Sequence, residues 1–133
     1  GWVAKSCTNL PGSSTWFDRA FVTYSNEAKQ QMLGVSGDDL NIHGAVSEQV
    51  AGQMAMGAKQ NAGVEVAVST TGIAGPDGDT PDKPVGLVHF GWSVGDQPAS
   101  CGAVVFAGDR NAVRQQTVLH ALEGLVARLE NLA

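Results

Sequence analysis

Residues 70–86, a glycine- and proline-rich stretch between two strand-like runs, constrain the fold more than any other part of the chain. The run 64–69 before it alternates apolar residues, and the run 87–94 after it is again apolar. The stretch holds four glycines and three prolines, too many residues and too stiff a backbone for a hairpin turn. Loops of this length are usually functional or disordered. The stretch therefore predicts a shaped, amide-rich loop that cradles a phosphate or a developing oxyanion.

The rest of the chain alternates helical and strand-like patterns, which favours a layered α/β domain with a mixed sheet. We expect one domain over residues 1–133. The expected helices are 2–7, 26–33, 38–42, 48–61 and 110–132, and the expected strands are 17–24, 64–69, 87–94 and 99–106. Serine or aspartate precedes several of these helices as a cap, and Gly63 ends one of them.

Composition excludes several classes of protein. A formal net charge of −5 argues against a nucleic-acid partner, which requires a basic face. No apolar run approaches the roughly 18 residues of a membrane span, so we expect no membrane partner. The chain contains two cysteines, Cys7 and Cys101, which match no metal motif and indicate a reduced, cytoplasmic protein.

The segment from Tyr24 to Lys29 lies where a predicted strand turns into a helix. Ser25 and Lys29 are four residues apart and share a helix face. A desolvated lysine beside a hydroxyl can serve as a general base, and Tyr24 could relay a proton or orient a substrate. The alternative is structural: a capping serine, a solvated lysine and a core tyrosine. The spacing alone does not decide between the catalytic and the structural interpretation.

Other charged motifs give weaker signals. Asp77 and Asp79 resemble the start of a calcium loop, but its sixth and twelfth positions are Asp82 and Val88, so the pattern fails. Lys83 does not complete a phosphate loop either, because Pro84 follows it. The three histidines lack ligand spacing, and we expect no metal site. Arg110 opens the last helix, where it is either an anion clamp or an exposed arginine beside a capped terminus.

Six segments in this order carry a family resemblance: 11–14, 16–29, 44–48, 71–78, 83–86 and 106–110. Together they resemble the CinA C-terminal domain, a family that includes stand-alone bacterial nicotinamide-nucleotide amidases. The resemblance implies a three-layer α/β/α fold and hydrolysis of the carboxamide of nicotinamide mononucleotide (NMN) to nicotinate mononucleotide and ammonia. It also implies a homodimer or higher homo-oligomer, a small nucleotide as the only other partner, and no cofactor.

The resemblance also assigns roles. Lys29 and Tyr24 are the expected catalytic residues, beside a serine nucleophile from a Glu-Ser-Cys-Thr-Gly-Gly motif. The expected substrate-binding residues are Ser25, Thr71, Gly72, Gly75, Lys83 and Arg110, with loop amides near the two glycines facing the oxyanion.

One departure from the family pattern is large. Gly1 matches the last glycine of the serine motif, so the serine itself is not in the sequence, and Ser6 falls after the motif at a helix end. We expect a natural polypeptide longer than 133 residues at its N-terminus, or a partner chain that fills the gap. The alternative is a non-catalytic nucleotide-binding or dimerising relative that lacks the nucleophile.

Overall fold

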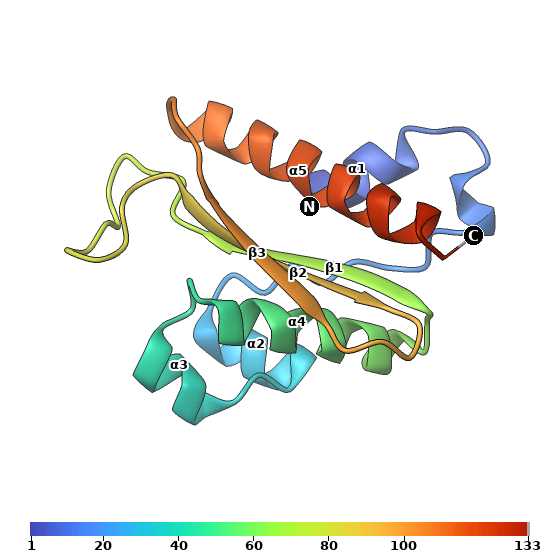
Figure 1. The fold of residues 1–133 in the computed structure, drawn as a ribbon, viewed down its shortest axis with the longest axis horizontal. Coiled ribbons are helices and arrows are strands. Elements are labelled where there is room, and N and C mark those ends of the chain that lie inside the picture. The colour runs from blue at the N-terminus through green and yellow to red at the C-terminus, as the bar shows by residue number, and fades with distance from the viewer. Residues whose placement is uncertain (133) are drawn as a thin grey trace.

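The computed structural model describes residues 1–132 and contains helices on both sides of one small sheet (Figure 1). The helices are α1 (Trp2–Thr8), the short 3₁₀ turn η1 (Ser13–Thr15), α2 (Asn26–Leu33), α3 (Gly37–His43), α4 (Glu48–Ala62) and α5 (Arg110–Glu130). The strands are β1 (Val66–Gly72), β2 (Leu87–Val94) and β3 (Ser100–Val105).

The sheet has the order β1-β2-β3, and helices cover both of its faces. Helix α5, with α1 beside it, covers one face, whereas α4 covers the other and carries α2 and α3 on its outer side (Figure 1). The predicted α/β fold of three layers is therefore confirmed. Both strand pairs are antiparallel, whereas the sequence predicted a mixed sheet. The difference arises from the connections between the strands. Neighbouring strands that are joined by a hairpin turn, or by a loop without a crossover helix, run antiparallel.

The centre of the sheet packs tightly against both helix layers. Phe90 and Trp92 of β2 stack with ring centroids 5.6 Å apart and are buried with Val113 of α5. On the opposite face, a Cβ at Gly91 would lie 2.3 Å from the carbonyl oxygen of Ala51 in α4. Only glycine permits so close an approach of helix to strand at this position.

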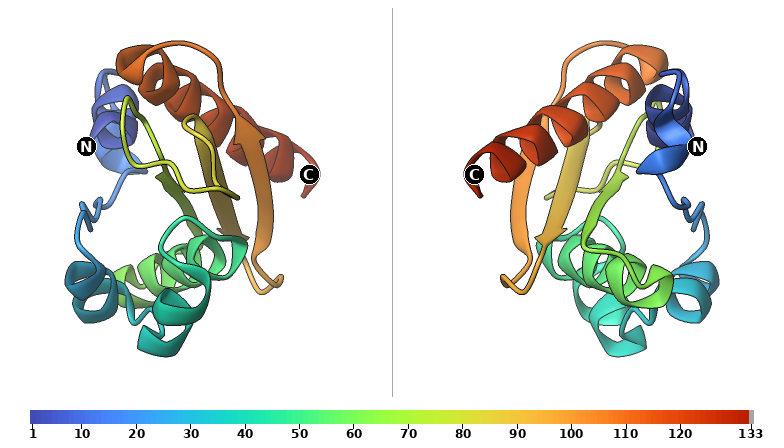
Figure 2. Two further views of the ribbon diagram at one scale, coloured as in Figure 1. Left: turned by 90° about the vertical axis from the view of Figure 1, so that its left-hand side faces the viewer. Right: turned by 90° about the vertical axis from the view of Figure 1, so that its right-hand side faces the viewer.

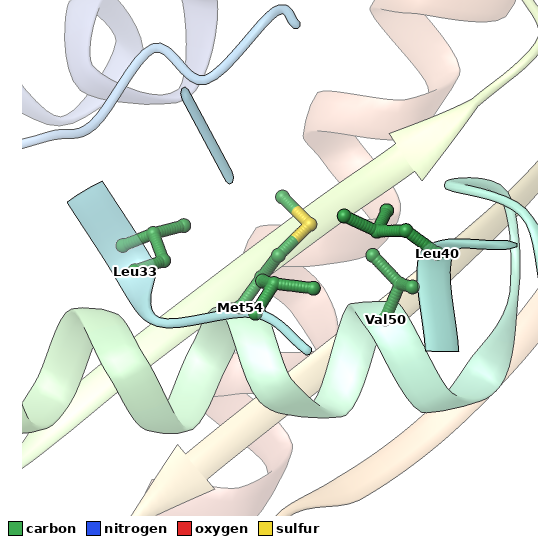
Figure 3. Packing of buried hydrophobic residues seen from close by; sticks show 5 residues of the cluster. Leu33, Leu40, Val50 and Met54 are labelled. Atoms are coloured by element: carbon green, nitrogen blue, oxygen red, sulfur yellow. The ribbon is translucent and has the colours of Figure 1, made fainter. Parts of the chain in front are cut away.

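A second apolar cluster joins α4 to the outer helices. Figure 3 shows Leu33 from α2, Leu40 from α3, and Val50 and Met54 from α4 pointing toward one another. All four residues are buried, each with at most 7% of its surface exposed. The cluster explains why the short helices α2 and α3 are stable, because isolated helices of seven or eight residues are marginal in water.

The helix ends follow the local signals in the sequence. Ser25, Ser47 and Asp109 cap α2, α4 and α5, and each side chain accepts a hydrogen bond from the amide three residues later. Gly63 ends α4 in the left-handed conformation, with φ of 65°. These predicted boundaries are confirmed to within two residues.

Two predicted strands need correction. Residues 17–24 form no strand, and within the described chain no backbone hydrogen bond joins them to another strand. The segment passes instead from the α1 layer to the α2 layer, beside but apart from β1 (Figure 2). Aromatic and β-branched residues favour a strand only where a partner strand is in reach. Strand β1 is shifted to 66–72, because the two threonines and Gly72 continue its ladder with β2.

Candidate active site

A groove of about 970 Å³ separates residues 16–24 from the outer edge of β1. β1 lies at the end of the strand order, so among residues 1–132 its outer edge has no strand partner. Gly1, Trp2 and Val3 line one part of the groove, and residues 64–72 line another. The two helix layers extend past β1 above and below it (Figure 2). The groove is thus a gap in the sheet layer, closed on two faces by helices.

The helical lining of the groove is mainly apolar. Val118, Leu122, Leu125 and Leu129 of α5 face it, and Met54 and Ala58 of α4 line it as well. These leucines and Val118 repeat at helical spacing and form one apolar stripe along α5. Part of the stripe lies over the groove instead of over the sheet, and Leu129 accordingly remains 40% exposed.

Lys29 is the buried cation of the groove. It lies on the first turns of α2, only 6% of its surface is exposed, and its Nζ donates a hydrogen bond to the carbonyl oxygen of Thr23 at 2.6 Å. Burial lowers the pKa of Lys29 from the ordinary value of 10.5. The neutral amine, which is the form able to accept a proton, is therefore more populated than in an exposed lysine.

Tyr24 and Arg110 meet at the rim, and both line the groove. Tyr24 is 86% exposed, and its hydroxyl lies 3.5 Å from Nη2 of Arg110. Nη1 of Arg110 donates to the carbonyl oxygen of Gly75 at 2.8 Å. The first residue of α5 therefore links the long loop to residues 17–24, two regions far apart in the sequence.

The loop between β1 and β2 is held at its base by backbone hydrogen bonds. Ile73 donates to Leu87, and Gly86 donates back to Ile73, at 2.9 and 2.8 Å. Gly72 and Ala74 line the groove, whereas Gly75, with φ of 86°, lies just outside it. Within residues 1–132, the amides of Ala74 and Gly75 donate to no backbone or side-chain acceptor. Two successive free amides next to a groove are suited to an oxyanion.

The other predicted site residues make contacts within the fold. The Ser25 hydroxyl caps α2 by accepting from the amide of Ala28 at 3.0 Å, and Ser25 does not line the groove. Thr71 lines the groove, but its hydroxyl donates to the carbonyl oxygen of Ala45 at 2.8 Å. Lys83 lies outside the groove lining, and its ammonium donates to the carbonyl oxygen of His43.

Sequence reasoning missed two groups in this site. The carbonyl of Thr23 accepts a hydrogen bond from Lys29, and the amide of Ala74, like that of Gly75, has no acceptor within residues 1–132. Both are backbone groups, so no residue type signals them. The position of Ala74 between two predicted binding glycines was the one available hint.

Metal-binding clusters and membrane-crossing helices are both absent from the described residues. No group of three or more His, Cys, Asp or Glu side chains in residues 1–132 is placed to hold a metal ion. None of the helices in that part of the chain is both long and apolar enough to cross a bilayer.

Comparison with known proteins agrees with this architecture. Residues 1–129 match the family model described as the CinA C-terminal domain. The chain belongs to this family. A nicotinamide-nucleotide amidohydrolase PncC of Escherichia coli is 52% identical over 125 residues, which are 94% of this chain and 76% of the relative. The Pseudomonas putida PncC is 46% identical over 95% of this chain and 78% of its own length.

Solved structures of the family share the fold. A competence/damage-inducible protein from Agrobacterium tumefaciens superposes with a TM-score of 0.93 at 44% identity, covering 96% of this chain and 78% of its own. A CinA superfamily protein from Klebsiella pneumoniae gives a TM-score of 0.94 at 32% identity, covering 98% and 81%. The enzyme class predicted from the sequence, hydrolysis of an amide, agrees with the names of the amidohydrolase relatives.

Proposed function

We propose that this protein hydrolyses the carboxamide of NMN, releasing nicotinate mononucleotide and ammonia for pyridine-nucleotide recycling. Membership of the CinA C-terminal domain family and identities of 46–52% to nicotinamide-nucleotide amidohydrolases support amide hydrolysis. The observation that carries the proposal is Lys29, a buried lysine with a lowered pKa that faces a groove beside free loop amides.

In the proposed reaction, Lys29 acts as the general base. It takes the proton from the serine of the Glu-Ser-Cys-Thr-Gly-Gly motif that the family resemblance implies, while the serine oxygen attacks the amide carbon. The resulting oxyanion accepts hydrogen bonds from the amides of Ala74 and Gly75, worth roughly 3–4 kcal/mol per donor in other enzymes. The protonated Lys29 returns its proton to the leaving nitrogen, and ammonia departs. Water then hydrolyses the acyl-enzyme with the same base.

The remaining assignments concern substrate binding. Arg110 uses two of its five donors on Gly75 and Tyr24, so other donors of the guanidinium are available to a phosphate or carboxylate. Tyr24 is exposed on the rim, where its ring can lie against a substrate. Thr71 and Gly72 would contact substrate through the backbone of β1, and Ser25 would act through the position of Lys29.

Ammonia release from NMN by the purified protein tests the proposal. Lys29→Ala should reduce kcat/KM by about 10²–10⁴-fold, the usual contribution of a general base. Lys59→Ala is the matched control, because Lys59 also donates to a backbone carbonyl, that of Gly95, but lies outside the groove lining. Near-normal turnover by a folded Lys29→Ala variant would refute the base assignment. No turnover by the natural protein would refute the function.

A further inference from the structure

The connection between α3 and α4 has three successive carbonyl groups that side chains hold in place. The carbonyl oxygens of His43, Gly44 and Ala45 accept hydrogen bonds from Lys83, Ser47 and Thr71, respectively. Ser47 belongs to the same connection, but Thr71 comes from β1 and Lys83 from the long loop. This short piece of backbone is therefore fixed to two other parts of the fold.

Features on both sides of the contact between Lys83 and His43 support it. In the loop, Lys83 and Thr80 exchange backbone hydrogen bonds of 3.2 and 2.9 Å, so the position of Lys83 is tied to the loop tip. On the other side, Gly44 has φ of 76°, and a Cβ there would lie 2.9 Å from Nζ of Lys83. Glycine at this position leaves room for the ammonium.

Charged neighbours surround this contact. Burial, and next the charge of Lys83, lower the pKa of His89 on β2, whereas Glu48 at the start of α4 raises it. His43, whose carbonyl accepts from Lys83, carries its ring 3.8 Å from Asp39. The ammonium thus lies at a junction of the loop, the sheet and the α3–α4 connection.

The chain on both sides of the Lys83–His43 contact, the α3–α4 connection and the long loop, continues to the groove. Ala45 and Val46, next to the accepting carbonyl, line the groove on one side. The loop reaches the groove at Ala74, and Arg110 holds the neighbouring Gly75 from the α5 side. The loop is therefore attached to the α5 layer by Arg110 and to the α4 layer by Lys83.

We propose that Lys83 is a positioning residue of the amidase site. By binding the carbonyl of His43, it holds the loop 73–86 against the α3–α4 connection and so fixes the amides of Ala74 and Gly75 relative to the groove wall. This inference rests on the proposed function, and it differs from the role expected of Lys83 from the family resemblance, direct contact with the substrate phosphate.

Kinetics with two substrates separates positioning from phosphate binding. For Lys83→Met, positioning predicts a loss in kcat of about 10-fold, below the 10²-fold that a displacement of 1 Å can cause. The loss should be equal for NMN and for nicotinamide riboside, which lacks the phosphate. Lys83→Arg should recover part of it. A raised KM for NMN alone would overturn the inference in favour of phosphate contact.

Hydrogen exchange tests the attachment without any turnover. In Lys83→Met the hydrogen-bonded loop amides of Thr80, residue 83 and Gly86 should exchange faster than in the wild type, while α4 and β2 keep their protection. Lys59→Met is the control, since it removes a comparable ammonium–carbonyl contact from Gly95, and loop exchange should not change. Unchanged loop exchange in Lys83→Met would overturn the inference. Absence of amidase activity in the wild type would refute the proposed function. The exchange measurement would then still test whether Lys83 holds the loop in place.

Discussion

At the centre of the sheet, Phe90 and Trp92 are buried against α5, whereas at the β1 edge the same helix turns Leu122 and Leu129 toward an open groove. The centre is closed on both faces and contains the closest contacts between helix and strand, as at Gly91. Among residues 1–132, the edge instead contains a buried lysine, loop amides without a protein acceptor and a strand without an outer partner. One sheet thus combines a closed centre, which we expect to supply most of the stability, with an open edge, where we propose that the chemistry takes place.

The largest effect on stability is expected at the centre. Phe90 is fully buried and touches Trp92, Phe106 and His120 with ring centroids 4.5–6.2 Å apart. Phe90→Ala should lower the free energy of unfolding by about 3–5 kcal/mol, because it removes apolar contacts and leaves a cavity. Urea unfolding followed by tryptophan fluorescence measures the change. A loss below about 1 kcal/mol would mean that the centre of the sheet does not supply most of the stability of the fold.

An intermediate effect is expected where the groove meets α2. Ser25 caps the helix that carries Lys29, so Ser25→Ala should cost about 1 kcal/mol of unfolding free energy. Ser25→Asp should retain most of the stability, since aspartate is an equally good cap and its charge suits the helix N-terminus. Thermal unfolding of the two variants checks this. An Asp variant as unstable as the Ala variant would show that the hydroxyl does more than cap.

The smallest effect is expected on the groove side of α5. Leu129 is 40% exposed, so Leu129→Ala removes few buried contacts and should cost about 1 kcal/mol or less, against 2–5 kcal/mol for a leucine in a closed core. Urea unfolding in parallel with Phe90→Ala makes the comparison direct. A cost of 3 kcal/mol or more would mean that Leu129 is covered in solution, and the groove would not be open there.

The sequence predicted most helices and two strands because their signals are local. Ser25, Gly63 and Asp109 act on residues within one turn, and the hairpin β2–β3 is closed by a short turn at Gly95. Residues 17–24 were predicted wrongly because strand formation depends on a partner elsewhere in the chain, which the segment's own residues do not report.

The site was predicted unevenly for the same reason. The sequence pointed to Tyr24, Lys29, the long loop and Arg110, and the structure brings these together around one groove, with Arg110 meeting Tyr24. The groove itself could not be foreseen, since the leucine stripe of α5 shows an apolar face but not what it faces. The attachment of Lys83 to His43 joins residues forty positions apart through a backbone carbonyl, which leaves no mark in the sequence.

The pH dependence of NMN deamidation by the natural protein tests most directly whether the β1-edge groove is the active site with Lys29 as its base. Because the neutral amine is the active form and burial lowers the pKa of Lys29, kcat/KM should rise with pH through a single group that titrates below 10.5. Lys59→Ala should keep this rise, and Lys29→Ala should lose it along with most of the activity. The same rise in a folded Lys29→Ala variant would contradict the account.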